Sequence, residues 1–245
     1  MIDFNPPDAT IERMPFVAAS VALLPLAGAA SSAFPAANDA PPIAGFPAAI
    51  KRIVDVLIAA FLLLVLAVPM LLIAAAIRLD SRGPALFHQR RIGKDDQPFD
   101  LLKFRTMYQH PPEHGRLLQT RRGDPRITRV GALLRHLSLD ELPQLLHVLS
   151  GQMSLVGPRP HAPGSCAGGI PFERLSVWYP LRHSVRPGMT GLAQVRGWRG
   201  ETDTRDKLLM RLASDLEYIE NWRLRLDFVI VLRTIGAVLR MRNAY

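Results

Sequence analysis

The sequence predicts an α+β fold that is attached to a membrane from one side, a monotopic arrangement, and three observations support this. Residues 56–77 carry no charged side chain and are interrupted by Pro69. Two short segments, 85–92 and 99–107, flank a polar turn and have the composition of a small β-hairpin. Later segments place apolar residues at helical spacing, which predicts several amphipathic helices at the membrane interface.

Composition indicates anionic partners. The 245 residues include 30 Lys and Arg against 21 Asp and Glu, a net charge of +9, and 49% of the chain is hydrophobic. A basic yet apolar chain favours anionic membrane lipids and anionic substrates. Nucleic acid is the competing partner, but the sequence has no zinc-ligand spacing, RNP-like aromatics or evident helix-turn-helix, so we expect no nucleic-acid binding. The lone Cys166 excludes an internal disulfide.

Three regions follow one another along the chain. Residues 1–49 are rich in Ala and Pro, which predicts a disordered tail. Residues 50–78 form the expected membrane helix. Residues 79–245 form a domain on the cytoplasmic face of the membrane, and this domain carries the candidate catalytic residues described below.

Pro69 decides how the apolar segment meets the membrane. At about 1.5 Å per residue, the uncharged run is long enough to span the hydrocarbon core. A proline inside a helix removes a hydrogen bond and forces a kink or break. Basic residues flank both ends of the run, so the positive-inside rule assigns both ends to the cytoplasm. We therefore expect a Pro-broken, re-entrant helix; a spanning helix and a buried core helix are the alternatives.

A second membrane element is expected near the C-terminus. Residues 224–239 are mostly apolar and are interleaved with arginines. This mixture is typical of a helix that lies along lipid headgroups, although a core helix with a solvated basic edge fits equally well.

The second expected strand, 99–107, carries two cations. Lys103 and Arg105 are two residues apart, so they share one face of the strand. Such a pair can grip a diphosphate, and a solvated strand edge is the alternative explanation.

The most informative segment begins at an acidic pair, Asp140 and Glu141. Four leucines between residues 142 and 149 recur at helical spacing, which predicts a helix from Asp140 to about residue 150, with Pro143 in its first turn. With Asp140 as the N-cap, both carboxylates lie at the positive end of the helix, which keeps them ionised and attracts phosphate. Neighbouring helical residues point about 100° apart, so one acid can be a nucleophile and the other a metal ligand or base. Ser138 and Glu141 also match a capping box, which is the structural alternative.

Two arginines accompany the acidic pair. Arg135 precedes Asp140 by five residues and falls in or just before the turn that leads to it. Its guanidinium could neutralise a transferring phosphoryl group or pair with a carboxylate. Arg159 lies between Pro158 and Pro160, which hold its backbone extended and lower the entropy lost on binding phosphate.

Taken in order, these segments resemble the bacterial sugar transferase family, the monotopic polyprenyl-phosphate phosphoglycosyl transferases. The resemblance covers about residues 50–240 and rests on Lys51-Arg52 before the run broken at Pro69, Gln89 to Gly93, Lys103 to Met107, Asp124 to Thr128, the acidic pair, Gly157 to Pro160, and Arg186 to Gly191. Segments 108–123 and 161–179 depart from the family pattern, and Leu137 replaces the usual small hydroxyl residue. The donor sugar therefore stays open.

The resemblance implies an enzyme of the bacterial inner membrane with its active site on the cytoplasmic face. Asp140 would attack the β-phosphorus of a UDP-sugar, expel UMP and hold the sugar phosphate until undecaprenyl phosphate accepts it. Mg²⁺ would bind at Asp140 and Glu141, and substrate phosphates would contact Arg135, Arg159, Lys103 and Arg105. The product would start an exopolysaccharide, O-antigen or capsule-type glycan, and the enzyme could form a homo-oligomer. An inactive membrane adaptor that binds polyprenyl phosphates is the alternative.

Overall fold

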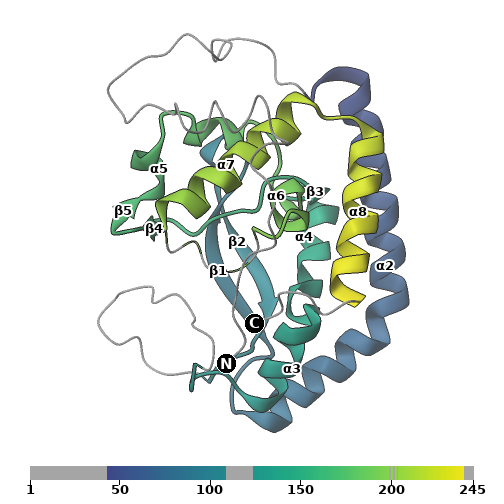
Figure 1. The fold of residues 1–245 in the computed structure, drawn as a ribbon. Helices are drawn as coiled ribbons and strands as arrows, with labels where there is room; N and C mark the ends of the chain where they lie inside the picture. Colours follow the sequence, from purple (N-terminus) through teal and green to yellow (C-terminus); the bar gives the residue numbers. More distant parts are fainter. Residues whose placement is uncertain (1–42, 109–123, 199, 201, 203, 240–245) are drawn as a thin grey trace.

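A long helix, α2 (Gly45–Asp80), forms one side of the molecule in the computed structural model, which describes residues 43–108, 124–198, 200, 202 and 204–239 (Figure 1). Within these residues, α2 is the one helix long and apolar enough to cross a membrane by length and composition. Many of its large apolar side chains are exposed, including Phe46, Leu64 and Leu79. So much uncovered apolar surface on one helix favours contact with lipid.

Pro69 lies inside a helix that is not interrupted. Of the expected kink or break, the structure has no break, and Figure 1 shows that the lower part of α2 is inclined to the upper part. A bend accommodates the missing hydrogen bond and the bulk of the proline ring without ending the helix. The re-entrant path through a membrane stays a prediction.

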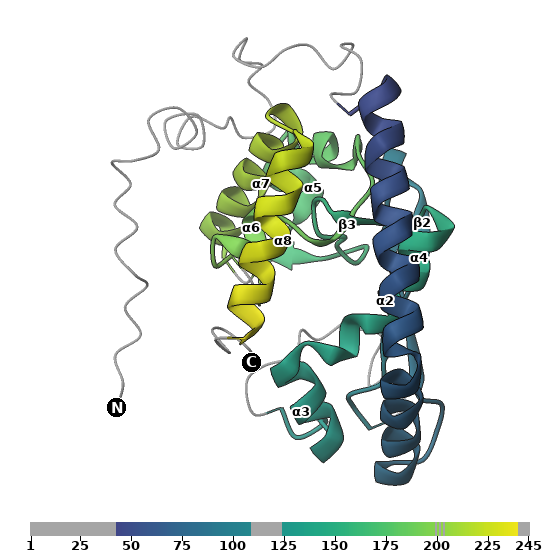
Figure 2. The same cartoon turned by 90° about the vertical axis from the view of Figure 1, so that its right-hand side faces the viewer.

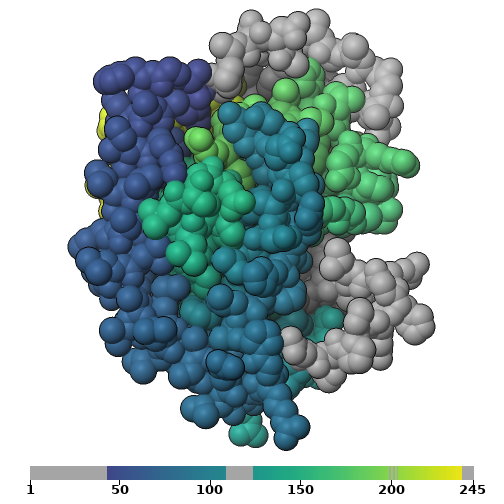
Figure 3. Space-filling model, turned by 180° about the vertical axis from the view of Figure 1, so that it is seen from behind, coloured from purple at the N-terminus to yellow at the C-terminus, as the bar shows by residue number. Residues whose placement is uncertain are grey.

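The expected β-hairpin is present. Strands β1 (Leu86–Ile92) and β2 (Pro98–Phe104) are antiparallel, and a 3-10 turn, η2 (Lys94–Asp96), joins them. Phe99 and Leu101 of β2 are buried in a core that also contains Ala59 of α2 and residues of the helix α4 (Leu145–Ser150). Figure 3 shows α4 on the surface between α2 and the hairpin. This core holds the segment after the acidic pair against the membrane helix.

The acidic segment differs from the single helix that the leucine pattern predicts. Helix α3 (Arg129–Leu137) ends at Ser138, whose left-handed backbone (φ 58°) reverses the chain, and a 3-10 helix, η3 (Leu139–Gln144), precedes α4. Pro143 has no N–H to donate within the segment and restricts the residue before it, which explains why the α-helix begins only after it. Asp140 lies in the first turn of η3 and is not an N-cap. The Ser138 side chain caps nothing there, so the capping box does not form.

The remaining elements complete the domain. They are β3 (Ser154–Val156) paired in parallel with β6 (Gly188–Thr190), β4 (Cys166–Ala167) paired with β5 (Ile170–Pro171), and the helices α5 (Phe172–Leu175), η4 (Tyr179–His183), α6 (Leu192–Val195), α7 (Arg205–Glu220) and α8 (Leu224–Leu239). An ion pair between Lys51 of α2 and Asp227 of α8 joins the first parts of these two helices, and Figure 2 shows β3 between the helices further along.

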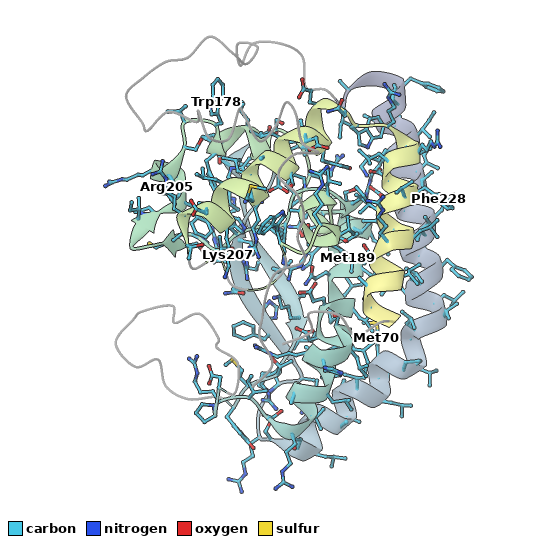
Figure 4. All side chains as sticks on the ribbon, viewed as in Figure 1. Met70, Trp178, Met189, Arg205, Lys207 and Phe228 are labelled. Carbon is cyan, nitrogen blue, oxygen red and sulfur yellow. The ribbon has the colours of Figure 1, made fainter. Side chains whose placement is uncertain are left out.

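Helix α8 has two different faces. Ile230 is fully buried with Tyr218, whereas Phe228, Leu232 and Ile235 are exposed, and Figure 4 shows Phe228 pointing away from the protein. The helix is therefore packed on the core along one face and leaves an apolar strip uncovered along another. The packed face agrees with the core-helix interpretation. The exposed strip lies on the same side of the molecule as α2, and its contact with lipid stays a prediction.

Candidate active site

The turn between α3 and α4 places the acidic pair against the β-hairpin, because η3 packs on β2. Four of the sequence-predicted residues surround Asp140 closely enough to influence its charge: Glu141, Lys103, Arg135 and Arg159. These groups come from four different segments, so the fold has brought together residues as far apart as 103 and 159.

Asp140 is half-buried and has an unusual environment. Burial raises its pKa to about 6, the Glu141 carboxylate acts in the same direction, and the neighbouring cations lower it. Loss of water on burial therefore outweighs any stabilisation of the charge by the short 3-10 turn, although the carboxylate remains ionised near neutral pH as expected. Across the residues that the structure describes, no hydrogen bond or ion pair engages the Asp140 carboxylate. It is still mostly ionised at pH 7 and is open to a ligand.

Glu141 has different surroundings. Arg159 grips it with both ends of its guanidinium: Nη1 donates to Oε2 at 3.0 Å, and Nη2 donates to Oε1. Arg159 Nη1 also lies 3.5 Å from the carbonyl oxygen of Met189, next to the loop that follows β6. The Arg159 guanidinium therefore fixes the Glu141 carboxylate and places a positive charge close to Asp140.

Two more cations complete the group. Lys103 on β2 is half-buried, and burial lowers its pKa to about 8 against the opposing effect of Glu141. Its ammonium therefore remains mostly protonated at pH 7. Arg135, in the last turn of α3, donates from Nε to Thr106 Oγ1 at 2.8 Å. Among the described residues its other guanidinium N–H groups have no acceptor, so they can bind an anion.

Arg105 does not join this site. Its side chain is buried and donates to the carbonyl oxygens of Ser81 (2.7 Å) and Arg82 (2.8 Å), and to Ser81 Oγ (3.0 Å). Strand β2 ends at Phe104, so the two-residue alternation used to pair Arg105 with Lys103 no longer applies. The structure corrects that assignment: Arg105 binds the carbonyls of Ser81 and Arg82, in the turn that follows α2.

Two arginines that sequence analysis did not assign to the site hold the C-terminal end of α4, the helix that follows the acidic segment. Arg52 of α2 donates to the carbonyl oxygens of Val148 and Leu149 (2.8 Å to the latter), and Arg186 Nε donates to that of Gly151 (2.8 Å). The last carbonyls of any helix need such donors. That general need was the available signal, but a single sequence does not say which cation supplies them.

The carboxylates are compatible with Mg²⁺ bound together with a substrate. In the described part of the chain no three His, Cys, Asp or Glu residues gather as a metal site. Mg²⁺, however, is usually held through one or two carboxylates, with substrate phosphates and water as its other ligands. The open Asp140 and the adjacent Glu141 supply that minimal set.

The exposed apolar helix α2 indicates a protein that associates with a membrane. The Asp140 carboxylate lies near a lysine and two arginines, and such a site suits phosphate chemistry. The match to a family model then places it: residues 46–241 fit the bacterial sugar transferase description, and the chain belongs to that family.

Curated relatives of the chain carry names that agree with this family. The chain is 52% identical over 197 residues to a UDP-glucose:undecaprenyl-phosphate glucose-1-phosphate transferase of Caulobacter vibrioides, covering 80% of this chain and 72% of the relative. It is 50% identical over 195 residues to an undecaprenyl-phosphate glucose phosphotransferase of Komagataeibacter xylinus, covering 80% of this chain but 37% of the relative. A third relative, the exopolysaccharide production protein PSS of Rhizobium leguminosarum bv. phaseoli, is 49% identical over 186 residues, or 76% of this chain and 93% of the relative. The chain thus spans little more than a third of one relative and nearly all of another.

Proposed function

We propose that this protein transfers a sugar 1-phosphate from a UDP-sugar to undecaprenyl phosphate and releases UMP. The observation that carries the proposal is the open Asp140 carboxylate among Lys103, Arg135 and Arg159. The names of the relatives give the substrate classes, and glucose is the sugar named in two of the three. We therefore propose UDP-glucose as the first donor to test, and a lipid-linked diphosphosugar that starts a surface polysaccharide as the product.

In the first step, an Asp140 oxygen attacks the β-phosphorus of the UDP-sugar. The bond between that phosphorus and the bridging oxygen breaks, and UMP leaves with the bonding electrons. The sugar phosphate remains esterified to the carboxylate. Phosphoryl transfer needs positioning and charge neutralisation more than proton transfer, and the surrounding cations provide both.

In the second step, an oxygen of undecaprenyl phosphate attacks the same phosphorus. The Asp140–phosphorus bond breaks and the free carboxylate returns, so atoms and charge balance over the cycle. Arg159 holds Glu141 in the structure, and the same fork can turn toward phosphate oxygens when a substrate arrives. Mg²⁺, held by Asp140 and Glu141, would add neutralisation of the diphosphate charge.

The position of the site suits both substrates. The exposed apolar surfaces of α2 and α8 lie on one side of the protein, where they can enter a bilayer, and the polar domain lies on the other (Figures 1 and 2). A lipid-bound phosphate and a soluble nucleotide can meet only at such a boundary. We place the protein on the cytoplasmic face of the bacterial inner membrane, in contact with anionic lipids.

The test is UMP release from UDP-glucose with undecaprenyl phosphate and Mg²⁺, using wild-type protein, Asp140→Asn and a control, Asp100→Asn, on the exposed side of the hairpin. We expect release with the wild type and the control but not with Asp140→Asn. Mass spectrometry of protein incubated with UDP-glucose alone should find a hexose phosphate on Asp140. Normal turnover by Asp140→Asn, or an adduct elsewhere, would refute the nucleophile.

A further inference from the structure

The backbone that carries Arg159 is held by a donor at every residue. Four consecutive carbonyl oxygens, from Pro158 to His161, each accept a hydrogen bond from a different donor: Gly188 N (2.9 Å), Arg182 Nη2 (2.7 Å), Arg91 Nη1 (3.0 Å) and Ile92 N (3.1 Å). Two of these donors are backbone groups of strands, and two are arginine side chains. Buried backbone carbonyls usually find a donor, and here the donors come from β6, η4 and β1, so the segment is tied to three separate elements.

Arg182 of η4 is the most constrained of these donors. Its side chain is buried, and each of its five N–H groups has an acceptor. Nε and Nη2 donate to Asp215 Oδ2 (3.1 and 2.7 Å), Nη1 donates to His161 Nδ1 (2.6 Å) and lies 3.3 Å from the Tyr179 hydroxyl, and Nη2 also donates to the Arg159 carbonyl. Because the guanidinium is planar and rigid, fixing four of its contacts fixes the fifth.

Asp215 is the anchor of this arrangement. It lies in α7, and its side chain and that of Arg182 are almost completely buried, at 3% and 2% exposure. Around the pair, Tyr179 packs in a core with Phe172, Leu208 and other apolar side chains. The guanidinium is thus set by a buried part of the domain that does not contain the acidic pair.

We propose that Arg182, oriented by Asp215, is a positioning residue for the reaction: it holds the main chain of Arg159 so that the Arg159 guanidinium meets Glu141 and the substrate phosphates. This inference rests on the proposed function, because the rate measurements that test it follow UMP release. A purely structural ion pair would stabilise the fold without acting through Arg159, and this difference can be measured.

The experiment is a double-mutant cycle on UMP release. Arg182→Lys keeps the charge opposite Asp215 but cannot supply the planar fork, so kcat/KM should fall about ten- to a hundredfold through misplacement of Arg159. In an Arg159→Lys background the same change should cost less than about twofold, because its target is already lost. Effects that multiply in the double variant, or no effect of Arg182→Lys, would overturn the proposal.

The matched control is another arginine–carboxylate pair whose carboxylate lies on the same helix, α7. Arg196 donates to both oxygens of Glu217 at 2.6 Å, and Glu217 lies two residues beyond Asp215 in α7. Within the part of the chain that the structure describes, no hydrogen bond or ion pair joins Arg196 or Glu217 to the segment from Pro158 to His161. Glu217→Gln should therefore leave kcat/KM within about twofold of wild type.

A second readout does not depend on activity. Hydrogen exchange of peptides covering residues 157–162 should become faster in Arg182→Lys, while global unfolding still requires similar denaturant. If Arg182→Lys does not fold, Arg91→Gln removes the neighbouring donor from a half-buried position and should give the same two changes; unchanged exchange and rate would sink the inference. If wild-type protein releases no UMP, the proposed function fails, and the exchange measurement alone still decides the positioning.

Discussion

Two clusters of acidic and basic side chains in this protein differ in whether every group has a partner. In the first, between α2 and α8, Lys51 Nζ donates to Asp227 Oδ2 at 2.6 Å and lies 3.7 Å from Asp55. Tyr218 donates its hydroxyl to Asp227 (2.8 Å), and Ser154 donates its hydroxyl to Asp55 (2.7 Å). This network is closed, because its charged groups are satisfied within the fold.

The second cluster is open. Asp140 lies among cations yet engages none of the described residues by a hydrogen bond or ion pair. A closed buried network stabilises one arrangement of helices, whereas an open one keeps a charged group ready for a ligand at some cost to the fold. Whether a charged group has a partner within the fold therefore distinguishes structural from functional charges better than residue type or burial does. Variants at the two clusters can test this distinction.

The largest effect is expected for Asp140→Asn. Loss of the nucleophile should lower kcat by about 10⁴-fold or more. Stability should not fall: the folded-state pKa of about 6 lies above the ordinary value of 3.8, so ionisation destabilises the fold progressively above pH 4, and the neutral amide removes that cost at pH 7. Thermal unfolding in detergent measures it, and a clearly lowered Tm would mean that the cluster is closed after all.

Asp227→Ala, in contrast, should lower the stability of the fold. It leaves the buried Lys51 ammonium without its nearest partner, which typically costs about 3–5 kcal/mol. Asp100→Ala is the control, since its pairing with Arg90 is exposed and long at 4.0 Å and should contribute less than about 1 kcal/mol. Urea unfolding gives both values, and equal stability of the two variants would contradict a structural role for the closed network.

Arg105 tests whether a buried arginine near the site has a structural role or binds substrate. Arg105→Met removes the donors to the end of α2 and should destabilise the protein by about 3 kcal/mol, while the KM for UDP-glucose of the folded fraction stays unchanged. A raised KM with unchanged stability would instead support the sequence-based assignment of Arg105 to phosphate binding.

Local sequence patterns predicted the elements that depend on local physics. The apolar helix follows from its uncharged run and the hairpin from two short strand-like segments around a polar turn, and both are present. The sequence predicts a helix at the acidic segment, but the structure has a 3-10 helix followed by the short α4. The left-handed Ser138 and the 3-10 helix depend on how the chain packs against β2. Periodicity alone does not record that packing.

Long-range polar pairs were beyond sequence reasoning. Arg182 and Asp215 are 33 residues apart, and nothing in the spacing of either singles out the other. Arg105 was misassigned for a related reason, since its partners are backbone carbonyls, which have no signature in a sequence. Asp140, Glu141, Arg135, Arg159 and Lys103 were found because they belong to recognisable motifs, and the structure brings them together.

The smallest expected effect concerns Lys103 and sharpens the account of the open cluster. A lysine pKa lowered to about 8 means that the ammonium is present below pH 8 and is lost as the pH rises through that value. The KM for UDP-glucose should therefore rise several-fold, up to about tenfold, between pH 7 and 9, since phosphate loses a cationic contact. Lys103→Arg stays charged throughout this range and should flatten the profile. A bound diphosphate favours the charged amine, so the alkaline limb should lie at higher pH in kcat than in kcat/KM, and coincident limbs would place Lys103 outside contact with the substrate.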